Sequence, residues 1–170
     1  MSAVVDSARG ENEGYTAGAD RPLGSYIGTL AVYGITNGAV VLLGRRRRGR
    51  LRAIGLHDLA LMTVTTHKVS RLIAKDPVTS PLRAPFTHCS GTAGPAEVAE
   101  EVRGKGVRHA VGELVTCPFC VAQWVATTYG AGLVFVPQAT RLAGGATMTA
   151  VAGSDWLQLA YARLQRSAEG

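Results

Sequence analysis

Two cysteines separated by two residues, Cys117 and Cys120, are the side chains best suited to chemistry in this 170-residue sequence. They end the block GELVTCPFC, residues 112–120, in which Thr116 suits a helix N-cap and Pro118 suits the first turn of the following helix. At a helix N-terminus the dipole favours the thiolate needed for disulfide exchange, and two thiolates at this spacing can bind one zinc ion. The third interpretation is a structural pair, packed or disulfide-bonded, at the helix entrance.

Both chemical uses of the cysteine pair need further residues. Redox chemistry of the thioredoxin type needs an exposed thiol in a βαβ context, whereas this motif opens an apolar helix. A zinc site needs two more ligands, and the nearest candidates are His88 and Cys89, the latter 28 residues before Cys117. Glu113, four residues before Cys117, suits a proton acceptor or a cap-like structural role. We expect no cofactor, with a zinc ion as the alternative.

The composition indicates a membrane protein. Hydrophobic residues make up 46% of the chain and charged residues 18%, below the roughly 25% usual in soluble domains, and the mean hydropathy is +0.12. A helix of about 20 mostly apolar residues crosses a bilayer. Three stretches have this character: residues 24–44, residues 119–138, and residues 142–159, of which the last carries Asp155. Residues 54–74 are helical in pattern, but ionisable side chains interrupt them.

Basic residues bear on the number of spans, because Lys and Arg concentrate in short cytoplasmic loops. If residues 54–74 do not cross, residues 45–108 lie on one side and hold 13 of the 18 basic residues. If residues 54–74 do cross, the basic residues are divided and the rule no longer selects an orientation. We predict an all-α integral membrane bundle of three to four transmembrane helices. Its parts are a disordered tail (1–23), a first span (24–44), a membrane domain (54–162, helices about 54–74, 119–138 and 142–162) and a C-terminal tail (163–170).

Polar and small residues within the spans suggest how the bundle is held together. Asp155 is expected to face His67 or Arg71, either as a pair that locks two helices or as part of an ion pathway. Gly34 and Gly38 form a GxxxG pattern that permits close helix packing. The expected partners are the lipid bilayer and a second copy of the chain or another membrane protein. Nucleic acid is not expected, because the basic residues flank apolar segments and suit lipid headgroups.

The middle of the chain predicts an ordered loop and a surface helix. Residues 76–86, DPVTSPLRAPF, contain three prolines, which exclude a continuous helix and favour an extended turn. Within it, Asp76 is expected to cap or to pair with Arg83, and Phe86 to insert into apolar surroundings. Residues 94–111 mix acidic and basic side chains and predict a short amphipathic helix on the surface.

Three ordered blocks resemble a known family. SRLIAKD (70–76), TSPLRAPF (79–86) and GELVTCPFC (112–120) are similar to a bacterial multi-pass membrane family classed as a domain of unknown function, one member of which is described as a sporulation protein. The positions matching its pattern are Arg71, Asp76, Arg83, Phe86, Glu113, Cys117, Cys120 and Trp124. The resemblance implies that residues 54–74 form a span, and it brings no activity or cofactor. A role in sporulation or the cell envelope is an expectation by analogy.

Two hypotheses for function follow. The usual motifs of serine hydrolases, P-loop proteins, zinc proteases and dinucleotide-binding enzymes do not occur in the sequence, which points away from an enzyme. The first hypothesis is a non-enzymatic membrane scaffold or accessory subunit. The alternative is a membrane thiol-redox or metal-binding protein that uses Cys117 and Cys120.

Overall fold

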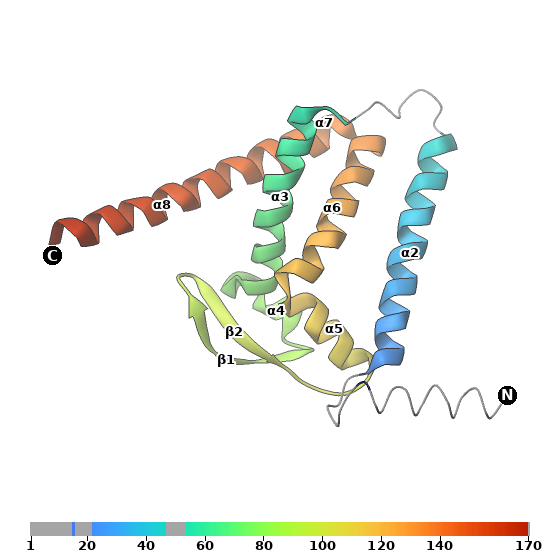
Figure 1. Cartoon of the computed structure of the whole chain (residues 1–170), viewed down its shortest axis with the longest axis horizontal. Coiled ribbons are helices and arrows are strands. Elements are labelled where there is room, and N and C mark those ends of the chain that lie inside the picture. The colour runs from blue at the N-terminus through green and yellow to red at the C-terminus, as the bar shows by residue number, and fades with distance from the viewer. Residues whose placement is uncertain (1–14, 16–21, 47–53, 170) are drawn as a thin grey trace.

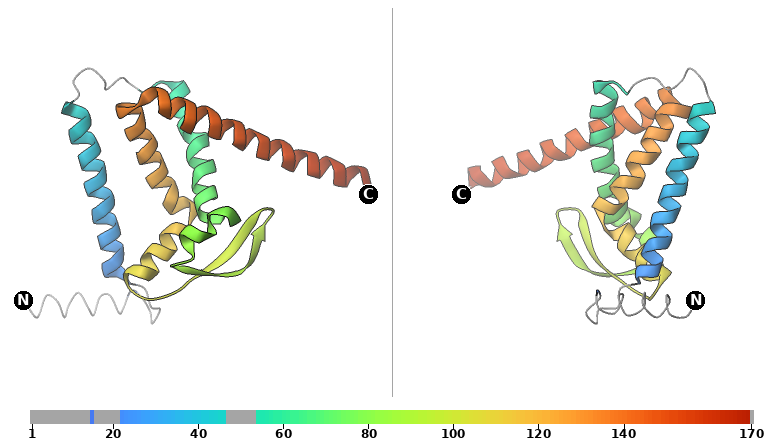
Figure 2. Two further views of the ribbon diagram at one scale, coloured as in Figure 1. Left: turned by 180° about the vertical axis from the view of Figure 1, so that it is seen from behind. Right: turned by 45° about the vertical axis from the view of Figure 1, so that its right-hand side comes forward.

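The computed structural model describes residue 15, residues 22–46 and residues 54–169, and most of these residues are helical. Helix α6 (Pro118–Phe135) lies between α2 (Leu23–Arg46) and α3 (Leu56–Lys75), as Figures 1 and 2 show. Helix α2 coincides with the predicted segment 24–44, α3 with segment 54–74, and α6 with segment 119–138. The predicted tail, residues 1–23, lies outside the described residues except for residues 15, 22 and 23.

Shorter elements close the two ends of this group. Helix α5 (Val107–Thr116) precedes α6 at one end, and at the other end α7 (Pro137–Ala139) and the π-helix η2 (Thr140–Ala146) follow it. Helix α8 (Thr147–Glu169) then packs against α3 and projects away from the body (Figure 1). It continues through residues 163–169, which the sequence assigned to a C-terminal tail.

A hairpin replaces the predicted surface helix over residues 94–111. Strands β1 (Thr87–Gly94) and β2 (Glu97–Val102) pair antiparallel, and helix α5 begins only at Val107. Pro95 lies in the two-residue turn between the strands, where the fixed φ of proline suits a turn. The fold is therefore mostly helical, in keeping with the predicted all-α class, and carries in addition one small two-stranded sheet.

The second residue of the hairpin turn, Ala96, has a φ of +58°, in the left-handed region that costs an L-residue about 1–2 kcal/mol. We predict that Ala96→Gly raises the free energy of unfolding by up to about 1 kcal/mol, because glycine adopts this φ without the Cβ conflict but loses more entropy on folding. Chemical denaturation in detergent measures the change. A loss of stability would contradict the expectation.

The proline-rich segment is ordered, as predicted, but it is helical rather than extended. It forms a 3-10 turn, η1 (Pro77–Thr79), and one turn of α-helix, α4 (Ser80–Arg83). The Asp76 carboxylate accepts a hydrogen bond from the backbone N–H of Val78 at 2.8 Å, so Asp76 is a cap. Phe86 is half-buried beside Gly112 of α5.

Helix α3 is fastened to η2 by polar contacts and close packing. The Arg141 guanidinium donates to both carboxylate oxygens of Asp58, at 2.7 and 2.8 Å, and this hydrogen bonding raises the pKa of Arg141 above its ordinary value. The Thr65 hydroxyl donates to the carbonyl of Gly144 at 2.8 Å. The buried Tyr129 ring of α6 lies against the same turn of η2. These contacts fix α3, α6 and η2 as one packed unit.

Among the described residues, α2 is the helix long and apolar enough to cross a membrane, with a mean hydropathy of 1.6. Helices α5 and α6 together would make a second candidate if the pair, bent by 82°, is one span. The sequence analysis predicted three to four spans. By helix length and composition, the described residues support one span, or two if the bent pair counts as one. Helix α3 carries Asp58, Lys68, Arg71 and Lys75, and α8 interrupts its apolar residues with Asp155, Gln158 and Arg163.

Candidate functional site

The cysteine pair sits at the bend between α5 and α6. Cys117 is the N-cap of α6, and its Sγ accepts a hydrogen bond from the backbone N–H of Cys120 at 3.4 Å. Both residues are free thiols, with Cys117 half-buried and Cys120 exposed. Pro118 stands in the first turn, as predicted, but the predicted cap Thr116 belongs to α5, where its hydroxyl donates to the carbonyl of Gly112 at 2.8 Å.

Glu113 connects α5 to α2. Its carboxylate accepts a hydrogen bond from the hydroxyl of Tyr26 on α2 and lies 3.5 Å from Nε2 of His109. This arrangement fits the structural interpretation of Glu113. Further along α2, the ring of Tyr33 meets the ring of Trp124 on α6 edge to face, with centroids 5.2 Å apart. The family-pattern position Trp124 thus helps to seat α2 on α6.

The structure does not assemble the zinc ligands considered from the sequence. His88 and Cys89 lie on the exposed strand β1, where Nε2 of His88 is 3.3 Å from a carboxylate oxygen of Glu101. Within the described ranges, no group of three or more His, Cys, Asp or Glu side chains is placed to hold a metal ion.

Arg83 forms the most deeply buried polar centre, with none of its surface exposed. Its Nε donates to Glu100 Oε2 at 2.6 Å and its Nη2 to Glu100 Oε1 at 3.1 Å, so the two groups form a bidentate ion pair. The guanidinium also donates to the carbonyls of Ile73 and Asp76 and to the hydroxyl of Thr79. Arg83 therefore joins the end of α3, the proline-rich segment and β2 through one side chain. The expected partner Asp76 contributes its backbone carbonyl, whereas the ion pair is made with Glu100.

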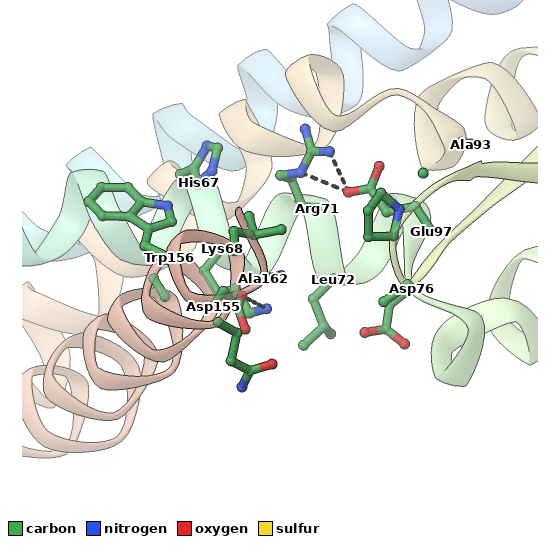
Figure 3. Close-up of a pocket in the computed structure, with 16 residues that line it drawn as sticks. His67, Lys68, Arg71, Leu72, Asp76, Ala93, Glu97, Asp155, Trp156 and Ala162 are labelled. Atoms are coloured by element: carbon green, nitrogen blue, oxygen red, sulfur yellow. Dashed lines mark hydrogen bonds and ion pairs between the residues drawn. The ribbon is translucent and has the colours of Figure 1, made fainter. Parts of the chain in front are cut away.

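A groove brings together four residues singled out from the sequence: His67, Arg71, Asp76 and Asp155. It has a volume of about 840 Å³ and lies between α3, the hairpin turn and α8, as the close-up in Figure 3 shows. The pairing differs from the expectation, because Asp155 forms an ion pair with Lys68 rather than with His67 or Arg71.

Arg71 pairs instead with Glu97 at the start of β2. Sequence reasoning missed Lys68, Glu97 and Glu100 as partners. Lys68 is adjacent to His67 in the sequence, and Lys68 and Arg71 are the two Lys or Arg residues within one helical turn of His67. This position could have identified Lys68 as a candidate partner of Asp155. No local pattern identifies Glu97 and Glu100 as partners. They lie in a segment of mixed acidic and basic residues, 94–111, which predicted an amphipathic surface helix.

Comparison with known proteins gives one relative and one family. The chain is 28% identical over 110 residues to the sporulation protein YjcA of Bacillus subtilis (strain 168), covering 59% of this chain and 93% of that protein. No solved structure matches the chain. A family described as a protein of unknown function, DUF1360, matches residues 61–161, a range that includes the groove residues of α3 and the cysteine pair. Because this match covers more than half of the 170 residues, the chain belongs to the DUF1360 family.

Proposed function

We propose that this protein is an integral membrane scaffold or accessory subunit without catalytic activity, in which α2, α3 and α6 cross the bilayer together. The surface of α2 carries the proposal. Ile27, Leu30 and Ile35 expose 68%, 69% and 71% of their surface, and Gly44 is the one buried residue of the helix. A helix that is apolar around its circumference and has little protein cover is stable against lipid chains.

Helix α3 suits a span beside α2 despite its charges. Asp58 lies in its first turn, and Lys68, Arg71 and Lys75 lie among its last eight residues, so residues 59–67 contain no Asp, Glu, Lys or Arg. Lys and Arg near a helix end extend their charged groups to the interface while their stems stay in the apolar region. This supports an α3 that crosses with α6, against which it packs most extensively.

The ionisable side chains support a structural role. Arg83 with Glu100, Arg71 with Glu97, and Glu113 with Tyr26 each join two different elements. Groups committed to such bonds hold the bundle and its hairpin in place. By analogy with the relative YjcA, which is named as a sporulation protein, we place this scaffold in sporulation or the cell envelope.

The scaffold has a surface for a partner within the membrane. Gly34 and Gly38 lie on an exposed face of α2, and a Cβ atom added at either position would have no neighbour within 4 Å. Small residues at this spacing let two helices approach closely. We therefore include a second copy of the chain, or another membrane protein, as the partner of α2.

A membrane thiol protein is the second candidate, and the contact between Cys117 and Cys120 favours it. Serine substitution of both residues separates the two candidates. For a scaffold, Cys117→Ser with Cys120→Ser is expected to accumulate in membranes and to restore function in a deletion strain to nearly the wild-type level. A variant that accumulates and unfolds normally but restores no function would overturn the scaffold in favour of thiol chemistry.

Membrane insertion is tested by alkaline carbonate extraction of cell membranes. We expect the protein to remain in the membrane pellet, because apolar spans are not released when peripheral contacts are broken. Recovery of most of the protein in the supernatant would contradict a spanning bundle.

A further inference from the structure

We propose that the groove between α3, the hairpin turn and α8 binds the headgroup of a zwitterionic aminophospholipid, with the phosphate against α3 and the ammonium among the carboxylates. This inference rests on the proposed function, because its ligand is a membrane lipid. The groove volume of about 840 Å³ lies within the roughly 300–1,000 Å³ usual for small-molecule sites.

Helix α3 supplies donors for a phosphate. Arg71 uses Nε and Nη2 on one oxygen of Glu97, Oε1, and its Nη1 stands outside that ion pair. Lys68 has three N–H donors and makes one hydrogen bond to Asp155. The exposed ring of His67 has no hydrogen bond or ion pair within the described residues. All three residues line the groove: His67 and Arg71, four positions apart, share one face of α3, and Lys68 lies beside that face (Figure 3).

The charges of the lining select a zwitterion over an anion. Two basic side chains, Lys68 and Arg71, line the groove together with three acidic ones, Asp76, Glu97 and Asp155, so the formal charge of the lining is −1. A ligand that carries only a phosphate would be opposed by this negative charge. A phosphate joined to a primary ammonium satisfies both sets of groups.

The remaining wall is apolar and points to a lipid rather than a free headgroup. Trp156 and Leu159 of α8 line the groove and expose 63% and 56% of their surface, and Leu72 of α3 also lines it. Glycerol and the first methylenes of an acyl chain would cover this surface. A Trp ring at such a site has its apolar body against the chains and its N–H toward the headgroup region.

Native mass spectrometry of the full-length protein in detergent tests the site. The titrants are dilauroyl phosphatidylethanolamine, dilauroyl phosphatidylglycerol and glycerophosphoethanolamine, which lacks acyl chains. We expect one saturable phosphatidylethanolamine adduct, bound at least about tenfold more tightly than the other two. Equal or tighter binding of phosphatidylglycerol would overturn the zwitterionic site. Equal binding of glycerophosphoethanolamine would overturn the lipid and leave a free phosphate ester as the ligand.

Variants localise the binding. His67→Ala removes a side chain without a partner in the described structure and is expected to weaken phosphatidylethanolamine binding severalfold. Arg71→Gln is expected to weaken it about tenfold, because a charge-assisted contact is lost. The matched control Arg103→Gln changes an exposed arginine outside the groove and should bind like the wild type. Unchanged binding by His67→Ala and Arg71→Gln would overturn the proposal.

The outcomes also separate this inference from the proposed function. If alkaline carbonate extracts the protein from membranes but it still binds phosphatidylethanolamine selectively, the lipid site is supported and the spanning bundle is contradicted. If the protein stays in the membrane pellet but binds the three titrants equally, the spanning bundle is supported and the lipid site is contradicted.

Discussion

Arg83→Met is expected to lower the free energy of unfolding by about 3–5 kcal/mol, the cost of leaving one partner of a buried ion pair uncompensated. The Arg83 and Glu100 side chains expose 1% and 6% of their surface, so water cannot replace the lost guanidinium at the carboxylate. The carbonyls of Ile73 and Asp76 also lose a donor in the same change. Denaturant unfolding in detergent measures the difference, and reduced accumulation in membranes should accompany it.

Two further variants separate the buried ion pair from arginine loss in general. Arg83→Met combined with Glu100→Gln is expected to recover part of the stability, because the uncompensated carboxylate is removed. Arg103→Met, which changes an exposed arginine bonded to the carbonyl of Ala84, should cost less than about 1 kcal/mol. If Arg83→Met and Arg103→Met destabilise the protein equally, Arg83 does not hold the elements together as argued.

The helices that the sequence located best are those with long apolar runs. Residues 24–44 and 119–138 lack charged side chains and correspond to α2 and α6. The hydrophobic run by itself indicates a helix of this length, whatever its neighbours are. Residues 54–74 were also located, although their ionisable side chains made their relation to the membrane ambiguous from sequence alone.

The hairpin could not be found from local pattern. Glu97, Glu100 and Glu101 in a mixed charged segment resemble the exposed face of a helix, yet Glu97 and Glu100 are the partners of Arg71 and Arg83. These pairs join residues 26 and 17 positions apart. Helix propensities differ by only a few tenths of a kcal/mol per residue between such side chains, so tertiary contacts can override them. Tertiary contacts of this kind leave no periodic signal in a single sequence.

The candidate residues were found more readily than their partners. Arg71, Asp76, Arg83 and Asp155 all occupy structured polar sites. Asp76 takes the capping role, the first of its two expected roles, whereas Asp155 pairs with Lys68 in place of His67 or Arg71. A residue type shows that a charge needs compensation in an apolar chain. Which carboxylate provides it depends on the crossing of α3 and α8 and on the position of the hairpin, and these are properties of the fold.

Gly112→Val is expected to lower the free energy of unfolding by about 1–3 kcal/mol, the usual cost of overpacking a filled site. Gly112 is buried on α5, where an added Cβ would lie 2.5 Å from Cγ1 of Val102 on β2 and 3.1 Å from the carbonyl oxygen of Phe86. The Phe86 carbonyl is held by the backbone N–H of Arg103 at 2.9 Å, so it cannot retreat without breaking that bond. Thermal or denaturant unfolding in detergent measures the loss.

A double variant shows whether the steric conflict is the cause. Val102→Ala removes the nearer of the two obstacles, so adding it to Gly112→Val should cost less than the sum of the two single changes. The matched control is Gly38→Val in α2, where nothing lies within 4 Å of an added Cβ, and it should leave the stability of the monomer nearly unchanged. Additive losses in the double variant, or an equal loss in the control, would show that α5 does not pack closely on the hairpin. Because α5 leads into the cysteine pair and is bonded to α2 through Glu113, a confirmed conflict at Gly112 would establish that the hairpin supports both.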